Sequence, residues 1–305
     1  MQTQADRILY PVPASWKFLH SGKVREIYQV SKNELAIVAS DRVSAFDWIL
    51  PDAISDKGKI LCQISRFWFG KTQTICANHW LESQESSLPK DVWARTMLAR
   101  KAEVYPFEFI VRGYLAGSIW KAYQKNNGEL QIGDCKLEKG LKFGGPIPGG
   151  PILTPTTKEK TPGKHDEDVP WSEVDNSLGS VKAGIVREAA LKIFTFAHDY
   201  LEKRDLVMVD TKMEFGELEN GAIVLVDELL TPDSSRFWWK KDYDARDQKD
   251  SIEPLDKQVI RNYLEKDLRW DKKPPVPRLS SDVISKARSV YIEAFRAITG
   301  KDPIL

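Results

Sequence analysis

The chain has 305 residues, 45 basic and 44 acidic side chains, and a formal net charge of +1. This near balance argues against a general nucleic-acid or membrane binder, because both classes usually carry a basic excess. The three cysteines, Cys62, Cys76 and Cys135, lack metal-ligand spacing and favour a reduced protein. The N-terminus lacks a signal-peptide pattern, and no aliphatic run could span a bilayer. We therefore expect a cytoplasmic protein, and the charge balance still allows a local basic pocket for a small anion.

Patterns of apolar and turn-forming residues define the elements expected in the first half of the chain. Branched segments on either side of Ser31-Lys32-Asn33 predict a hairpin. Apolar residues at helical spacing predict two helices, the second ending at Asn126-Asn127-Gly128. In chain order we expect the hairpin at 24–40, a helix at 58–71, extended segments around Pro106 at 95–112, and a second helix at 119–125.

Residues 141–163 carry five prolines and five glycines, which predicts a loop. A loop of this length in a compact protein is often functional, and the alternative is a plain surface excursion. Beyond it, we expect an amphipathic helix at 181–204 and a hairpin at 206–230. Two further helices, at 256–268 and 281–299, are expected on either side of a proline-rich break. Strands early and in the middle, with helices late, indicate an α+β fold rather than regular βαβ winding.

The hairpin at 206–230 has the charge pattern of a metal site. Asn220-Gly221 is a strong turn signal, and a two-residue turn there would place Glu214 directly opposite Asp227. Strand alternation puts Asp210, Lys212 and Glu214 on one face. Facing carboxylates repel each other, but Mg²⁺ held together with nucleotide phosphates would reverse that sign. Lys212 would then contact a phosphate or a developing negative charge.

The alternative for this hairpin is a solvated strand face, with a bulge at Gly216 keeping the charges apart. Asp233, Ser234 and Arg236 follow at the end of the second strand. They supply an acid, a hydroxyl and a guanidinium to the same region, and helix capping by Asp233 or Ser234 is the alternative there.

Two segments are suited to anions. Gly22, Lys23 and Arg25 lead into the first hairpin, where the glycine permits close backbone approach and both cations share one side. P-loop spacing is absent, so a basic turn is the alternative. Arg112 and Ser118 flank a small-residue turn that opens a helix, a common phosphate site, although Ser118 as a plain N-cap also fits.

A third segment, with Asp41, Arg42 and Ser44, ends the second strand of the early hairpin. Acid, base and hydroxyl alternate there at a strand end, which is a usual place for site residues. An internally paired turn is the alternative reading.

Taken together, these segments resemble the phosphoribosylaminoimidazole-succinocarboxamide synthases, also called SAICAR synthetases. The matching stretches are SGKVREIY, SDRVSAFDWILPDAISDKGKILCQIS, EFIVRGYLAGSIWKAY, GGPILTPTTK, DTKMEFG and VDELLTPDSSRFW. They run from Ser21 to Trp238, and DKQVIRNYL also fits. Each piece alone is weak, but the joint pattern is specific and has the length of the longer single-chain form. One departure, Met213 where shorter members carry Leu, conserves volume and predicts no functional change.

The resemblance implies an ATP-dependent ligase of purine biosynthesis. It would join L-aspartate to 5-amino-1-(5-phosphoribosyl)imidazole-4-carboxylate (CAIR), giving SAICAR, ADP and phosphate, by way of an acyl phosphate. The implied fold resembles ATP-grasp and kinase-like architectures. It has an antiparallel-sheet N-terminal domain (1–105), a larger α+β domain (106–305) with C-terminal helices, and ATP in the cleft between them. We expect a monomer whose partners are small molecules, with no nucleic acid or membrane.

The resemblance also implies residue roles. The nucleotide would be bound by Gly22, Lys23, Arg25, Lys212, Glu214 and Asp227, with Mg²⁺ held by Glu214 and Asp227. The other substrates would contact Asp41, Arg42, Ser44, Arg112, Ser118, Asp233, Ser234 and Arg236. The catalytic residues would be Asp210, Lys212 and Asp233, and 154–158 match a further motif near the site.

Two other classes of protein fit the same metal–phosphate logic. A small-molecule or protein kinase would transfer phosphate to a hydroxyl, but its His-Arg-Asp and Asp-Phe-Gly segments are absent. A non-catalytic nucleotide-binding regulator would have lost the chemistry, yet the acids at Asp210, Glu214, Asp227 and Asp233 are intact.

Overall fold

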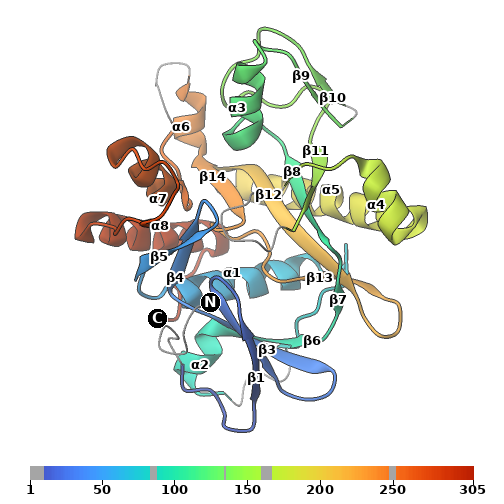
Figure 1. The fold of residues 1–305 in the computed structure, drawn as a ribbon, viewed down its shortest axis with the longest axis vertical. Coiled ribbons are helices and arrows are strands. Elements are labelled where there is room, and N and C mark those ends of the chain that lie inside the picture. The colour runs from blue at the N-terminus through green and yellow to red at the C-terminus, as the bar shows by residue number, and fades with distance from the viewer. Residues whose placement is uncertain (1–9, 83–87, 134, 159–166, 247–251) are drawn as a thin grey trace.

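The computed structural model describes residues 10–82, 88–133, 135–158, 167–246 and 252–305. Antiparallel sheets and surrounding helices form an α+β fold, which confirms the predicted class (Figure 1). The first sheet has the strand order β1-β2-β3-β6, with bounds Lys17–Ser21, Arg25–Gln29, Glu34–Ala39 and Thr96–Arg100. The predicted early hairpin is therefore present as β2 and β3. A separate short hairpin of β4 (Arg42–Ala45) and β5 (Trp48–Ala53) follows it.

The second sheet is built around one long strand, β12 (Leu206–Glu217). Its main path is β11-β8-β12-β13, and β7 and β14 also pair with β12. The bounds of these neighbours are Glu103–Val104 (β7), Phe107–Arg112 (β8), Ile152–Thr157 (β11), Ile223–Val226 (β13) and Ser235–Trp239 (β14). Every strand that pairs with β12 is antiparallel to it. Arg112, at the end of β8, and Arg236, near the start of β14, are therefore both paired with Asp210 on β12.

The helices cover both sheets. The first-half helices are α1 (Lys57–Thr72), α2 (Lys90–Arg95) and α3 (Gly117–Lys125), with the small hairpin β9 (Leu130–Ile132) and β10 (Cys135–Leu137) after α3. The second-half helices are α4 (Trp171–Leu178), α5 (Ser180–Glu202), α6 (Lys240–Asp244), α7 (Gln258–Asn262) with a π-helical turn (Tyr263–Asp267), and α8 (Ser281–Thr299). Helix α1 contacts β3 and β6 as well as α8, whereas α5 packs on β12 (Figure 1).

The register of the metal-site hairpin differs from the predicted one by one residue. Glu214 lies opposite Val226, not Asp227. The Leu218 N–H bonds the Ala222 carbonyl, so the turn holds three residues, and Gly221 has a φ of 81°. A glycine in the left-handed region at the third position is typical of a turn with a bulge, which Asn-Gly does not distinguish from a two-residue turn. Asp227 therefore follows the strand rather than belonging to it.

The predicted loop at 141–163 is wrong in its middle, because it contains β11 paired with β8. Pro155 hid this strand, since proline cannot donate to a central ladder. β11 is an edge strand, where a missing donor costs little. Residues 159–163 of that prediction lie outside the described ranges.

One apolar core extends across both sheets. It contains Ala39 and Met97 from the first sheet and Phe109 and Phe215 from the second. The predicted domain boundary between residues 105 and 106 falls between β7 and β8, and it stays a prediction. Among the described helices, none is long and apolar enough to cross a bilayer.

Candidate active site

A cavity of about 500 Å³ lies where β8, β12 and β14 meet the β4–β5 hairpin and the start of α7. Seven of its lining residues are basic and five are acidic. The basic residues are Lys23, Arg112, Lys158, Lys212, Arg236, Lys257 and Arg261. The acidic residues are Asp47, Glu108, Asp210, Glu228 and Asp233. This surplus of cations, in a protein of nearly neutral total charge, suits a ligand with several negative charges.

Arg112 lies at one end of the cavity and is bonded mainly to neutral groups. Its Nε donates to Thr154 Oγ1 at 3.0 Å, and its Nη1 donates to Ser118 Oγ at 3.1 Å. The carboxylate of the exposed Asp168 is 4.0 Å from Nη2. Burial lowers the pKa of Arg112, and the charges of Asp210 and Asp168 do not fully offset that effect. A buried guanidinium in this state is stabilised by an incoming anion.

Ser118 is not the N-cap of helix α3, so the N-cap interpretation of this residue is wrong. Helix α3 begins at Gly117, its N-cap position is Ala116, and no side chain caps it. The Ser118 hydroxyl instead accepts from Arg112, so both predicted phosphate ligands are brought together as expected.

Gly117 makes room for a second arginine. It has a φ of 60°, and a Cβ built there would lie 2.3 Å from the guanidinium of Arg236. Arg236 donates to Asp210, and the two residues face each other on β14 and β12. Burial lowers the pKa of Arg236, but Asp210 and Asp256 outweigh it and the pKa is raised.

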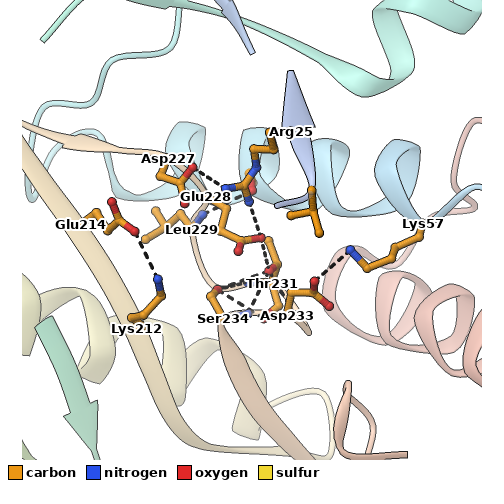
Figure 2. A network of polar contacts seen from close by, with 12 residues as sticks. Arg25, Lys57, Lys212, Glu214, Asp227, Glu228, Leu229, Thr231, Asp233 and Ser234 are labelled. Atoms are coloured by element: carbon orange, nitrogen blue, oxygen red, sulfur yellow. Dashed lines mark hydrogen bonds and ion pairs between the residues drawn. The ribbon is translucent and has the colours of Figure 1, made fainter. Parts of the chain in front are cut away.

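The middle of β12 carries a chain of alternating charges. Lys212 donates to Glu108 and, at 3.1 Å, to Glu214, while Lys158 donates to the other oxygen of Glu214 at 2.7 Å. Figure 2 shows the Lys212–Glu214 pair beside Asp227. Burial would raise the pKa of Glu214, but Lys212 and Lys158 lower it to about 2. Glu214 is therefore ionised, as a metal ligand or phosphate-site carboxylate must be.

Asp227 lies just beyond β13, where its φ of 66° turns its carboxylate toward Arg25 (Figure 2). Arg25 also approaches Glu228, with 2.9 Å between Nη2 and Oε2. Burial raises the pKa of Asp227, Arg25 lowers it, and the charges of Glu214 and Glu228 raise it further. The net direction is upward, with burial as the main cause and repulsion from the neighbouring carboxylates as a smaller one. A smaller cavity of about 20 Å³ lies beside Arg25 and Asp227.

The donor set at this end of the site fits Mg²⁺ bound together with a nucleotide. Within the described ranges, no three His, Cys, Asp or Glu side chains are grouped closely enough to hold a metal unaided. Mg²⁺ typically takes one or two protein carboxylates and completes its shell with phosphate oxygens and water. The repulsion between Glu214 and Asp227 is the kind that a divalent cation removes.

Asp233 is the centre of a buried cluster. Its Oδ2 lies 2.8 Å from Lys57 Nζ and 3.4 Å from Lys257 Nζ, and Tyr291 donates to its Oδ1 at 2.7 Å. Burial opposes ionisation of Asp233, but Lys257 and Lys57 hold its pKa well below the usual range. Burial lowers the pKa of Lys257 to about 8 despite Asp233. Ser234, the next residue, bonds the Thr231 backbone N–H through its hydroxyl and lines the cavity.

The remaining predicted residues divide between the cavity and the structure behind it. Lys23 and Ser44 line the cavity, and Lys23 Nζ is 3.0 Å from Asp47 Oδ1. Asp41 accepts from Arg95 at 3.1 Å and from the Gly58 N–H at 3.0 Å. Asp41 and Arg42 do not line the cavity, and neither do Arg25, Glu214 and Asp227. The predicted contacts of Asp41 and Arg42 with substrates stay predictions.

Gly22 is not required by its own backbone conformation. Its φ is outside the positive region, and an added Cβ would meet Arg25 O at 3.4 Å, an ordinary contact.

Five residues of the site were not singled out from the sequence: Lys57, Glu108, Glu228, Lys257 and Arg261. Lys257 and Arg261 are four residues apart at the start of α7, which is the spacing of one helix face. That spacing was a usable signal, whereas Lys57 reaches Asp233 only through the tertiary fold.

The comparisons with known proteins agree with this geometry. The family model of SAICAR synthetase matches residues 18–277. A phosphoribosylaminoimidazole-succinocarboxamide synthase of Halorhodospira halophila is 45% identical over 290 residues, which cover 93% of this chain and 95% of that protein. The counterpart in Thermodesulfovibrio yellowstonii is 44% identical, with the same coverage.

Solved structures give the same result. SAICAR synthase from Saccharomyces cerevisiae in complex with SAICAR has a TM-score of 0.77 and 32% identity, covering 99% of this chain and 98% of that one. A SAICAR synthetase in complex with ADP has a TM-score of 0.66 and 26% identity, covering 93% and 98%. The predicted resemblance is confirmed, and the chain belongs to the SAICAR synthetase family.

Proposed function

We propose that this chain is an ADP-forming ligase that condenses CAIR with L-aspartate to give SAICAR, at the 500 Å³ cavity. One observation carries the proposal: a single cavity is lined at one end by buried arginines suited to a phosphate ester and at the other by Lys212 and Lys158. These two lysines bind Glu214 just outside the lining, which gives a cluster suited to Mg-ATP. The family membership and the neighbour bound to ADP support the same reaction.

The ribonucleotide binds at the Arg112 end. Arg112 and Ser118 hold its 5′-phosphate, since this guanidinium is buried and lacks a close carboxylate. Arg261 is a further candidate for the same anion, because burial lowers its pKa and the charges of Asp256, Asp233 and Asp210 do not offset that effect. Asp210, paired with Arg236, lies next to Lys212 along the cavity and accepts hydrogen bonds from the imidazole substituents.

The nucleotide binds at the other end. Glu214 and Asp227 hold Mg²⁺, which when bound neutralises phosphate charge. Gly22, Lys23 and Arg25 cover the phosphates, and Lys212 faces the transferring group from β12.

The chemistry takes two steps. A carboxylate oxygen of CAIR attacks the γ-phosphorus of ATP, the bond to the β–γ bridging oxygen breaks, and ADP leaves. The aspartate amine then attacks the acyl carbon, phosphate leaves with the C–O bond electrons, and the nitrogen loses a proton. Lys212 offsets negative charge in the first step. Asp233, held ionised by two lysines, keeps Lys257 positioned at the cavity.

Release of ADP tests the proposal. Purified protein is assayed with Mg-ATP, CAIR and aspartate, with one component omitted at a time. Release that needs all three supports the ligase. Release that needs CAIR but not aspartate fits an acyl phosphate that water hydrolyses. Release without CAIR indicates phosphoryl transfer to water or to another acceptor, and absence of release with ATP bound indicates a regulator; either of these two results contradicts the proposal.

We also propose that the protein works in the cytoplasm as a monomer. The three cysteines, two of them buried, form no disulfide with one another, which supports a reducing compartment. Light scattering at micromolar concentration tests the monomer, and a dimeric mass contradicts it.

A further inference from the structure

We infer that Arg42 is a positioning residue that shapes the glycine loop, defined here as residues 21–24, for the nucleotide phosphates. The inference rests on the proposed role of this loop in binding ATP. It assigns Arg42 to the backbone of the loop rather than to a substrate, because Arg42 is buried and lies outside the cavity lining.

The guanidinium of Arg42 bonds three consecutive residues of the glycine loop. Nε donates to the Lys23 carbonyl at 3.0 Å, and Nη2 donates to the Gly22 carbonyl at 3.1 Å and to Ser21 Oγ at 3.3 Å. A planar guanidinium with five donors can hold several fixed acceptors at once, whereas a lysine ammonium offers a single point of charge.

These contacts decide which way the loop amides point. In a trans peptide the carbonyl and the following N–H are antiparallel. With the Gly22 and Lys23 carbonyls turned toward Arg42, the N–H groups of Lys23 and Val24 point away from it. Neither N–H has a partner among the described residues. Adjacent free N–H groups of this kind form an anion-binding concavity.

Other contacts keep the loop in this shape. The Gly22 N–H bonds the Arg25 carbonyl at 2.7 Å, and both Ser40 N and Ser40 Oγ donate to the Val24 carbonyl at 2.9 Å. The carbonyls of Gly22, Lys23 and Val24 thus all bind protein groups, which leaves the N–H groups of Lys23 and Val24 for a ligand.

Glu26 makes the burial of Arg42 possible. Arg42 Nη1 donates to Glu26 Oε1 at 2.6 Å, and Glu26 is fully buried. Its Oε1 also accepts from Ser21 Oγ at 3.0 Å, so the carboxylate is tied to the same loop. A buried pair of this kind contributes little net stability, which favours a positional reason for its presence.

The strand that carries Arg42 also reaches the cavity. Ser44, Phe46 and Asp47, at the end of β4 and in the turn after it, line the cavity, and Asp47 pairs with Lys23. The β4–β5 hairpin therefore contacts the loop twice: Arg42 binds backbone carbonyls of the loop, and Asp47 binds the side chain of Lys23.

The test compares Arg42→Lys with Arg66→Lys. Arg66 is also buried and also donates to two backbone carbonyls, those of Trp93 and Thr96, but it does not contact the loop. The Kd of Mg-ADP is measured by titration calorimetry, and the KM of each substrate by ADP release. Arg42→Lys should weaken Mg-ADP binding by roughly tenfold or more, the loss expected for charged hydrogen bonds. The KM of CAIR and of aspartate should change by less than about threefold, since neither contacts Arg42.

Amide hydrogen exchange distinguishes a local change in the loop from a general loss of stability. Mg-ADP should protect the amides of Lys23 and Val24 in the wild type and in Arg66→Lys, but not in Arg42→Lys. Equal protection in all three proteins overturns the inference, as does a CAIR KM that rises as much as the Mg-ADP Kd. Failure of the wild type to bind Mg-ADP would instead contradict the proposed function.

Two milder variants keep the inference testable if Arg42→Lys does not fold. Ser21→Ala removes one acceptor of Arg42, and Glu26→Gln keeps the hydrogen-bonding shape but removes the charge. Each should weaken Mg-ADP binding by about two- to fivefold, in line with the loss of one hydrogen bond. An unchanged Kd in both variants also overturns the inference.

Discussion

The two ends of the site neutralise their charged side chains in different ways. At the ribonucleotide end, Arg112 is bonded to two hydroxyls, and the Asp168 carboxylate lies 4.0 Å from its Nη2. At the nucleotide end, Lys212 and Lys158 already hold Glu214, and Arg25 already holds Asp227. The first end is organised to receive an anion as it stands. At the second end, ion pairs within the protein must be replaced by contacts with metal and phosphate. The affinity for the nucleotide there is therefore reduced by the free energy of the ion pairs that are lost.

The largest effect should come from the nucleotide end. Glu214→Gln should lower kcat by at least about a hundredfold at saturating Mg²⁺, because a metal carboxylate is lost. Glu217→Gln is the matched control, since Glu217 lies on the same strand but pairs with Lys182 and Tyr105 away from the cavity. Near-normal kcat for Glu214→Gln would remove the distinction between the two ends.

The next effect should come from the ribonucleotide end. Arg112→Ala should raise the KM of CAIR by about ten- to a hundredfold, in proportion to a lost charge-assisted contact, with a smaller change in kcat. Arg204→Ala, which removes a surface guanidinium stacked on Tyr200, should leave the KM unchanged. An unaltered KM for Arg112→Ala would show that the phosphate binds elsewhere.

Gly117→Ala tests whether the ribonucleotide end is preorganised. An alanine Cβ at Gly117 would collide with Arg236. At Gly133, which has a similar φ of 54°, no part of the described chain would lie within 4 Å of an added Cβ. Both substitutions should cost about 1–2 kcal/mol of stability for the left-handed backbone. Gly117→Ala alone should raise the KM of CAIR, by several-fold, and equal KM values for the two variants would contradict the role of the close approach.

The last comparison concerns the pH dependence of stability, for which the two ends should have opposite signs. Burial raises the pKa of Asp256, which bonds the Phe237 and Gln258 N–H groups behind Arg236, to about 6. The folded state then binds more protons than the unfolded state between about pH 4 and 6, so stability falls as pH rises through that window. Relative to Asp256→Asn, the wild type should lose about 2 kcal/mol across it.

Glu214 should behave in the opposite way. Its pKa is lowered to about 2, so its contribution is present above about pH 4 and is lost as pH falls toward 2. Denaturant unfolding of the wild type, Asp256→Asn and Glu214→Gln at pH 3, 4, 5 and 7 checks both slopes. Parallel curves would mean that neither carboxylate is perturbed.

Local patterns predicted the elements well where one rule decides the structure. Helix α8 has the expected bounds, and β2 and β3 form the expected hairpin. The rules failed where two outcomes share one signal. Asn220-Gly221 suits a two-residue turn and also a three-residue turn with a bulge, so the register was off by one. Pro155 argues against a central strand but not against an edge strand.

The site was less predictable than the fold. Charged residues on β12 could be aligned by counting, because strand alternation is local. The partners of Asp233 come from α1, α8 and the start of α7, and no local rule connects those segments. The hydrogen bonds from Arg42 to the loop carbonyls could not be predicted either, because they depend on the tertiary structure.

Strand β12 carries Asp210 at the ribonucleotide end and Glu214 at the nucleotide end, with Lys212 between them. Each step of two residues advances about 7 Å along an extended strand, and hydrogen-bonded neighbours on both sides prevent it from stretching. If the two substrates bind as proposed, the strand therefore fixes the distance between the phosphate donor and the acceptor carboxylate. A substrate analogue with one extra bond between its anion and its carboxylate must bend to react, because the strand does not lengthen.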